Sequence, residues 1–489
     1  MADHQTLEKL RHCGHLEVFS TSRHHLGFYK NVGCTAYYTI PTSSTSKPFE
    51  SLIYDALRIV IARHPILSAI PLNEDKPHPE AYFARLPTID LRSCIQFVER
   101  KTEFDPEAAD EELNALLAQQ HNLDYHDAVG TKPFWRLVIL RPSSSSSSSP
   151  MSFTASWIFH HALADGESGL VFQRTLLSAL QTLITTTAPP NGSPLIRSPT
   201  TPLLPPLGSL HPLPLSIPFI ALQLFYSIFP SLARARTLWT GPRITADPTL
   251  RTTRLTHIVF SPLTTQALVR LSRSHATTLT ATVQCLIAQS LLSNLDGATH
   301  DRVAMDGPLS MRRFITLADG KNIGDEIGCF PSTYVFEHHR PKHNSNSNSK
   351  SFDWAEAQAV RAKITAEIAK NGRNTKSALL RWVSSIPKWL EEEVGKERSE
   401  AFEFSNIGLY KPVPGTEDDG CRIGRVVFSQ CAPVAGAAFE VSAATGGDGC
   451  LTLAFSWLDG VLEERLMQAV IEGTRKGVED LVANESTTT

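Results

Sequence analysis

Ten prolines crowd into the stretch between Pro189 and Pro218, and no other feature of the sequence limits the fold as strongly. Proline lacks a backbone N–H and fixes φ, so this stretch is unsuited to a helix interior or a central strand. The chain has 489 residues, more than the roughly 250–300 at which single hydrophobic cores stop growing. We therefore predict two domains, residues 1–188 and 246–489, joined by a proline-rich crossover over residues 189–245.

Strand-like and helix-like patterns alternate on both sides of this crossover. Aromatic and branched side chains, or apolar residues at helical spacing, mark the expected elements. The expected strands are 36–40, 135–140, 153–159, 255–260, 425–428, 439–443 and 451–457, and the expected helices are 49–62, 263–292 with a break near Thr278, and 462–482. Two polar runs, 143–149 and 343–349, are typical of loops. The alternation predicts an α/β (α+β) fold with mixed sheets.

An apolar stretch, residues 217–232, follows the prolines. It is interrupted by Pro218 and Gln223 and falls short of the roughly 20 residues that span a bilayer. Two interpretations stay open. The stretch packs on the protein, as is usual for apolar segments of this length, or it dips into a membrane surface. Arg234 and Arg236, which follow it, favour the second interpretation.

Composition excludes several classes of protein. Forty-six basic and 49 acidic side chains give a net charge of −3, so there is no charge excess to attract nucleic acid. The eight cysteines are dispersed without a C-x-x-C pair, which indicates reduced, buried thiols and no metal site. The first residues lack the basic and apolar regions of a secretory signal. We expect a cytoplasmic protein, placed at the surface of the endoplasmic reticulum or of lipid droplets if the apolar stretch contacts a membrane.

The segment from His160 to Gly166, with the sequence HHALADG, carries the clearest chemistry. It follows an apolar strand, so its histidines leave a rigid element, as a catalytic base requires. A neutral imidazole can remove a hydroxyl proton near neutral pH and later return it to a leaving group. From residue chemistry alone, His161 is either such a base or part of a satisfied histidine pair in a tight turn. Asp165 either orients His161 or holds the turn, and we favour the structural role.

The same segment resembles the H-H-x-x-x-D-G signature of the coenzyme A-dependent acyltransferase superfamily. The opening residues 16–19 and 23–32, LEVF and RHHLGFYKNV, are similar to the start of fungal and yeast alcohol O-acetyltransferases. Further similar segments cover most of the chain in order: RHPIL at 63–67, KPFWRL at 132–137, PLSMRR at 308–313 and SNIG at 405–408.

This resemblance implies a chloramphenicol-acetyltransferase-like fold, in which two α/β domains with mixed sheets enclose a central tunnel. It implies that His161 is the general base, that Asp165 is structural and that His160 has a minor role. It suggests Arg63 as the partner of Asp165. It also makes Ser405, Asn406 and Gly166 candidates for binding the oxyanion or substrate, and His24, His25 and Tyr29 candidates for the acceptor pocket.

The expected activity is acyl transfer, with acetyl as the favoured group, from acyl-CoA to a small alcohol or a hydroxyl of a fungal secondary metabolite. Acetyl-CoA would act as co-substrate, with no bound cofactor, and a monomer is expected. Two alternatives stay open. One is a condensation-type acyltransferase that takes its acyl group from a carrier protein. The other is a catalytically silent binding protein of the same fold.

Overall fold

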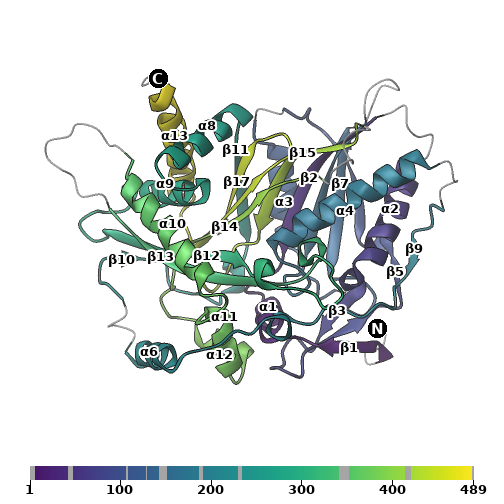
Figure 1. Ribbon diagram of the computed structural model, residues 1–489, viewed down its shortest axis with the longest axis horizontal. Coiled ribbons are helices and arrows are strands. Elements are labelled where there is room, and N and C mark those ends of the chain that lie inside the picture. The colour runs from purple at the N-terminus through teal and green to yellow at the C-terminus, as the bar shows by residue number, and fades with distance from the viewer. Residues whose placement is uncertain are drawn as a thin grey trace.

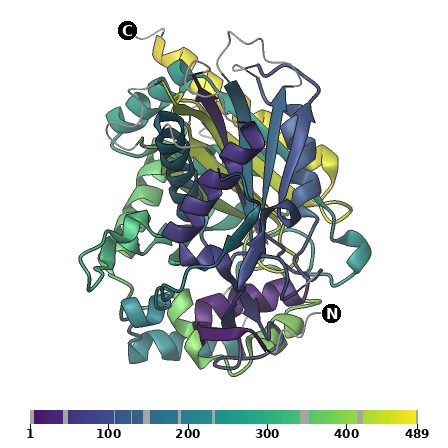
Figure 2. The ribbon, with the colours of Figure 1, turned by 90° about the vertical axis from the view of Figure 1, so that its right-hand side faces the viewer.

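The computed structural model describes residues 6–41, 48–105, 108–127, 129–142, 151–186, 191–229, 234–340, 352–412 and 420–486. Within these ranges the chain forms two lobes, each built on a mixed sheet with helices packed against it (Figures 1 and 2). The predicted α/β fold with mixed sheets is confirmed.

The first lobe is centred on a five-stranded sheet of order β15-β2-β8-β7-β6. Its strands are β2 (Val32–Ile40), β6 (Ile95–Arg100), β7 (Trp135–Pro142), β8 (Met151–Phe159) and β15 (Arg422–Gln430). The buried helices α2 (Phe49–Arg63) and α4 (Gly166–Thr185) pack together beside it (Figure 1). The other elements of this lobe are β1 (Glu8–His12), α1 (His15–His25), η3 (Pro65–Ser68), β3 (Ala69–Leu72), β4 (Tyr82–Arg85), β5 (Thr88–Asp90), η4 (Leu91–Ser93) and α3 (Glu111–His121).

The second lobe contains a seven-stranded sheet of order β10-β12-β14-β16-β17-β11, with β13 paired to β12. Its strands are β10 (Leu238–Trp239), β11 (Thr253–Phe260), β12 (Arg302–Ser310), β13 (Pro331–His339), β14 (Phe402–Leu409), β16 (Phe439–Thr445) and β17 (Leu451–Leu458). The helices are α8 (Pro262–Ser274), α9 (Leu279–Ser293), α10 (Trp354–Ala369), α11 (Lys376–Leu379), α12 (Ile386–Glu392) and α13 (Glu464–Ser486), with short turns η5 (Pro248–Leu250), η6 (Arg312–Phe314), η7 (Ile323–Asp325) and η8 (Leu380–Trp382).

One strand crosses between the lobes. β15 comes from the second half of the sequence, yet it pairs antiparallel with β2 of the first lobe, with Val427 opposite Thr35. It also packs against β16 and β17 of the second lobe. The two halves of the chain are therefore joined by a shared strand as well as by the crossover, and the predicted boundaries at residues 188 and 246 stay a prediction.

The crossover contains β9 (Leu195–Arg197), which pairs only with the short strand β5, and the helices α5 (Leu207–Leu210) and α6 (Ile217–Ile228). The expectation that the apolar stretch packs on the protein is wrong. No residue of α6 is buried, and Ile217 and Ile228 are 82% and 68% exposed. Within the part of the chain that the structure describes, no helix combines the length and the apolar character that a membrane span needs.

The other expected elements are present. The helical pattern over 263–292 is divided into α8 and α9, and Thr278 caps α9 by accepting a hydrogen bond from the Ala281 N–H. All eight cysteines are buried thiols that form no disulfide, as expected. The two polar runs, 143–149 and 343–349, lie outside the described residues.

Candidate active site

The HHALADG segment is the connection between the central strand β8 and the helix α4. β8 lies between β2 and β7, and the backbone N–H of His160 donates to Phe134 O at 2.9 Å. Asp165 is the N-cap of α4, with Oδ1 accepting from the Ser168 N–H at 3.0 Å. The turn is thus fixed at both ends, which holds the two histidines on a rigid frame.

His161 presents one ring nitrogen for chemistry. Its Nδ1 lies 2.9 Å from the carbonyl oxygen of Ala164. A carbonyl can only accept, so Nδ1 carries the proton and Nε2 of the neutral ring keeps its lone pair. The side chain is half-buried. His161 is therefore held in the tautomer that a general base needs.

The surroundings of His161 keep it neutral. Burial, followed by the positive charge of Arg23, lowers the pKa of His161 to about 4. Arg23 lies on α1, and its guanidinium carbon is 4.3 Å from the centroid of the Tyr29 ring. The Tyr29 ring is in turn 5.8 Å from the His161 ring, between centroids. At neutral pH the imidazole is unprotonated and can accept a proton.

The carboxylate of Asp165 is satisfied by four donors, none of which belongs to His161. Oδ1 accepts from the backbone N–H and the hydroxyl of Ser168, the latter at 2.8 Å. Oδ2 accepts from Arg312 Nη1 at 2.6 Å and from the Phe330 N–H at 3.0 Å. These contacts suit a structural role, because they tie the turn to residues 312–330 of the second half and leave the carboxylate occupied.

The predicted pairing of Arg63 with Asp165 is wrong. Arg63 is exposed at the end of α2, whereas the side chain of Arg312 is only 7% exposed and takes the partner's place. Arg312 also donates to Ser168 Oγ at 2.8 Å. Burial makes the difference, because a buried carboxylate requires a buried cation. The PLSMRR segment contains Arg312, so the sequence held a signal, but it did not show which arginine points inward.

His160 belongs to a separate buried cluster. Its Nδ1 accepts from the Ala162 N–H at 3.0 Å, so its Nε2 carries the proton and lies 3.0 Å from Glu74 Oε1. Burial alone would raise the pKa of Glu74, but His24 and His160 outweigh it and lower that pKa to about 2. Glu74 therefore anchors the first motif histidine behind the site. Sequence reasoning missed Glu74, since a single loop glutamate has no distinguishing pattern.

The three acceptor-pocket candidates lie in different places. His24 is buried, with Nδ1 donating to Glu74 Oε2 at 2.7 Å and Nε2 accepting from the Tyr125 N–H at 3.1 Å, so both ring nitrogens are occupied. His25 is exposed. Tyr29 alone of the three is recorded beside His161, and its hydroxyl donates to Gln430 Oε1 at 2.8 Å.

The second lobe reaches the motif through β14. A side chain at Gly166 would place its Cβ 2.5 Å from Ile407 Cγ2 and 2.9 Å from Phe428 Cζ, so the close approach of the lobes requires glycine here. Ser405 is buried in the same strand. The Asn406 side chain donates to Thr280 Oγ1 at 3.1 Å and accepts from the Gly408 N–H at 2.8 Å. The roles of Ser405, Asn406 and Gly166 in binding stay predictions.

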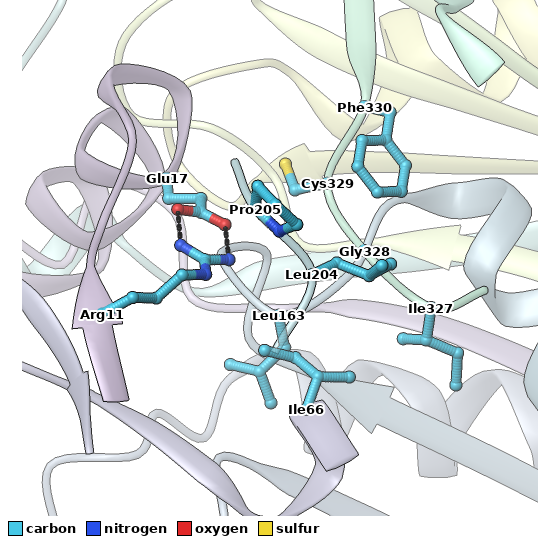
Figure 3. A pocket seen from close by; sticks show the side chains of 10 residues that line it. All are labelled: Arg11, Glu17, Ile66, Leu163, Leu204, Pro205, Ile327, Gly328, Cys329 and Phe330. Carbon is cyan, nitrogen blue, oxygen red and sulfur yellow. Dashed lines mark hydrogen bonds and ion pairs between the residues drawn. The ribbon is translucent and has the colours of Figure 1, made fainter. Parts of the chain in front are cut away.

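A small pocket lies on the side of the turn that carries Leu163 (Figure 3). Its wall is mostly apolar and includes Gly328 and Phe330 from the segment that clamps Asp165. The one ion pair in it joins Arg11 to Glu17 through two hydrogen bonds of 2.7 Å. This polar pair is already satisfied, and burial raises the pKa of the Cys329 thiol in the same wall well above its usual value, which keeps the thiol neutral.

Two side-chain groups among the described residues have the spacing of metal ligands: His24 with Glu74 and His126, and Cys285 with His338 and Glu356. In the first group, His24 Nε2 accepts a backbone hydrogen bond, so Nδ1 holds the proton and has no lone pair for a metal. In the second, His338 Nε2 faces the amide nitrogen of Gln284 at 2.8 Å, which likewise places the proton on Nδ1. The absence of a metal stays a prediction that this hydrogen bonding favours.

Comparison with known proteins gives consistent matches. The model of a family described as "Alcohol acetyltransferase" matches residues 93–472. "Probable alcohol acetyltransferase crmB" of Aspergillus fumigatus is 34% identical over 95% of this chain and 98% of its own. "Probable alcohol acetyltransferase FCK4" of Fusarium pseudograminearum is 24% identical over 94% of this chain and 93% of its own.

Solved structures agree on the fold. TRI3 trichothecene 15-O-acetyltransferase from Fusarium sporotrichioides has a TM-score of 0.69 at 13% identity and covers 96% of this chain and 94% of its own. The first condensation domain of the calcium-dependent antibiotic synthetase has a TM-score of 0.63 at 13% identity. The match covers 98% of this chain and 97% of that domain. At this identity the likeness establishes the architecture alone.

Proposed function

The chain belongs to the alcohol acetyltransferase family and transfers an acyl group to an alcohol hydroxyl; we propose that His161 is the general base of this transfer and that acetyl-CoA is the donor. The hydrogen bond from His161 Nδ1 to the Ala164 carbonyl carries the proposal, because it fixes the tautomer in which Nε2 can accept a proton.

The reaction needs one base and no covalent intermediate. His161 Nε2 takes the proton of the acceptor hydroxyl as the oxygen attacks the thioester carbonyl carbon. The new C–O bond forms, the C–S bond breaks, and the imidazolium returns its proton to the departing thiolate, which leaves as coenzyme A. The low pKa of His161 favours this return, because a weakly basic imidazole gives up its proton readily.

The negative charge that develops on the carbonyl oxygen requires a hydrogen-bond donor. Ser405 and Asn406 are our candidates because they lie on β14 directly before Ile407, and Ile407 contacts the start of α4. Loss of such a donor typically lowers turnover on the order of 100-fold. This assignment rests on the resemblance of the SNIG segment and on its position. The Asn406 amide nitrogen already donates to Thr280 Oγ1, so that hydrogen bond does not itself support the assignment.

The test of the base is coenzyme A release from acetyl-CoA, followed with a thiol reagent across alcohols from short aliphatic to polycyclic. Wild type should show release that depends on the acceptor, and His161→Ala should lower it by roughly 100-fold or more. His25→Ala is the matched control, because this histidine is exposed. Full activity in a folded His161→Ala protein would disprove the assignment.

We also propose that the enzyme works from the cytoplasmic side, in peripheral contact with a membrane through α6. Most of the exposed side chains of α6 are apolar, the exceptions being Ser227 and the hydroxyl of Tyr226, and its one amide side chain, Gln223, is among the less exposed. A surface helix of a soluble protein normally turns its polar side to solvent and its apolar side to the core, and α6 does the reverse. Trp382 is 68% exposed in η8, between α11 and α12, which lie near α6 in Figure 1. The neighbouring Arg381 donates to the Leu213 carbonyl ahead of α6. Exposed tryptophan beside an apolar helix is typical of membrane-surface contact.

A further inference from the structure

Three carboxyl side chains stand side by side on the second-lobe sheet. Asp306 on β12 is opposite Glu403 on β14, and Glu403 is opposite Glu440 on β16. Paired residues of neighbouring strands project from the same face, so the three form a row, which we call the carboxyl row. The alternating residues Phe402, Phe404, Phe439 and Val441 belong to the apolar core on the opposite face.

The carboxyl row faces the first lobe and leads to the base. Gln430 of β15 donates to Ser442 Oγ at 3.2 Å and lies 3.5 Å from Glu440 Oε2. The other end of the same amide accepts from the Tyr29 hydroxyl at 2.8 Å, and the Tyr29 ring is beside His161. Glu440 is thus separated from the catalytic base by two side chains, Gln430 and Tyr29.

The row ends at a buried hydroxyl without a partner. Ser456 of β17 is directly opposite Glu440, so it projects from the same face. It is 2% exposed, and its Oγ has no hydrogen-bond partner among the described residues. Buried hydroxyls are normally bonded, so this one has capacity for a polar group that the protein does not supply.

The carboxyls outnumber the cations around them. Arg23 lies at the His161 end, and Lys376, which pairs with Glu400 at 2.6 Å, lies at the Asp306 end. Burial, together with the neighbouring carboxyls, raises the pKa of Asp306 and of Glu440 well above the usual range. Protonated carboxyls both donate and accept hydrogen bonds, as hydroxyl groups do.

Coenzyme A does not suit this surface, because its anionic phosphate groups need cationic partners and the carboxyls here outnumber the cations. A simple aliphatic alcohol would cover the carboxyl row without forming hydrogen bonds to it, and burial of polar groups without hydrogen bonds is unfavourable in free energy. We propose that the carboxyl row, with Ser456, forms the acceptor side of the site, and that the acceptor is a polyhydroxylated alcohol whose additional hydroxyls bond to the row. This inference rests on the proposed function and specifies its acceptor class.

The test compares three acceptors with one six-carbon skeleton: 1-hexanol, 1,2,6-hexanetriol and 6-amino-1-hexanol, with saturating acetyl-CoA. We expect kcat/KM for the triol to exceed that for hexanol by about tenfold or more, the factor that one or two net hydrogen bonds supply. A preference for hexanol would overturn the inference. A preference for the amine would overturn it too, since it would mean that the row acts as ionised carboxylates.

Variants of Glu403 locate the effect. Glu403→Met keeps the length and removes hydrogen bonding, so the preference for the triol should fall by about tenfold. Glu403→Gln keeps neutral donors and acceptors and should retain it. The KM for acetyl-CoA should not change. Glu472→Met is the matched control, because this side chain is 73% exposed on α13. If Glu403→Met fails to fold, Glu440→Met replaces it. An unchanged preference in a folded Met variant would contradict the inference.

Failure of the proposed function would look different. Absence of release with these three acceptors and with the wider panel of alcohols would contradict acetyl-CoA as the donor. Triol binding to inactive His161→Ala, measured by calorimetry, remains a direct readout of the acceptor side, and absence of that binding would contradict the carboxyl row alone.

Discussion

The two motif histidines differ in what their Nδ1 atoms do. In His161, Nδ1 donates to the Ala164 carbonyl, whereas in His160 it accepts from the Ala162 N–H. The neutral rings are therefore opposite tautomers, and only His161 has a free lone pair on Nε2. The Nε2 of His160 instead carries the proton and lies 3.0 Å from Glu74 Oε1. Adjacent residues of one type thus take different positions, one anchored and one with the free lone pair that the proposed base needs.

The pH dependence of the reaction should reflect the lowered pKa of His161. Protonation removes the Nε2 lone pair, so activity requires a pH above this pKa, which is about 4. We expect kcat/KM to be constant down to about pH 5 and to fall as the pH drops through about 4, whereas an ordinary histidine would lose activity near about 6.5. Arg23→Gln removes a nearby positive charge and should move this limb to higher pH.

Assays returned to neutral pH after acid exposure control for unfolding. An acid limb near the ordinary histidine value in wild type, or a limb that does not move in Arg23→Gln, would contradict the assignment.

Removal of Arg312 should destabilise the fold. Arg312→Met leaves the Asp165 carboxylate buried without its cation, and breaking such a pair typically costs about 3–5 kcal/mol. Arg63→Met, at an exposed position, should change the free energy of unfolding by no more than about 0.5 kcal/mol. Urea unfolding followed by circular dichroism measures both. Equal stabilities of the two variants would show that the Asp165 pair does not matter.

At the scale of elements, α6 is unlike the other long helices. The helices α4 and α9 each have more than ten buried residues, whereas α6 has none. A helix of 12 residues spans about 18 Å, which is too short to cross a bilayer but sufficient to lie along its surface. The residues just before it are tied down, since Ser216 N donates to Asn374 Oδ1 at 2.8 Å. The helix is therefore fixed to the second lobe and presents its apolar side outward.

We expect the protein to co-sediment with phosphatidylcholine vesicles. Leu224→Glu with Ile228→Glu should weaken this binding by about tenfold or more, because each removes apolar surface that would enter the membrane. Leu263→Glu is the matched control, since Leu263 is an exposed apolar residue (79%) that lies on α8 and not on α6. Binding by wild type that survives the double substitution, or no binding by wild type at all, would contradict membrane contact through α6.

At the scale of the whole molecule, β15 makes the lobes interdependent. It completes the first-lobe sheet beside β2, although the sequence places it more than 380 residues later. Phe428 on this strand also meets the start of α4. Without β15, the edge of β2 would expose unpaired backbone groups and buried side chains.

The fragment of residues 1–245 should therefore fail to fold alone. We expect no cooperative thermal transition by circular dichroism, whereas the intact chain should unfold in a cooperative transition. A fragment that unfolds cooperatively would show that the first half is an independent domain.

Local patterns predicted much of this protein. Runs of aromatic and branched side chains marked β2, β7, β8, β16 and β17, since strand propensity depends on the residues of the strand itself. The HHALADG segment singled out His161, but residue chemistry left open whether this histidine is a base or part of a satisfied turn, and the family resemblance favoured the base. The apolar stretch at 217–232 was visible, but its burial was not, because exposure depends on what packs against it.

The sequence by itself thus determined part of the strands and helices and the position of the HHALADG turn, all of which depend on neighbours a few residues away. The tertiary structure decided which arginine meets Asp165, which glutamate holds His160 and how Asp306, Glu403 and Glu440 come to share one face. The physical reason is that these contacts join residues tens to hundreds of positions apart. Burial and strand register, which only the folded chain defines, select them.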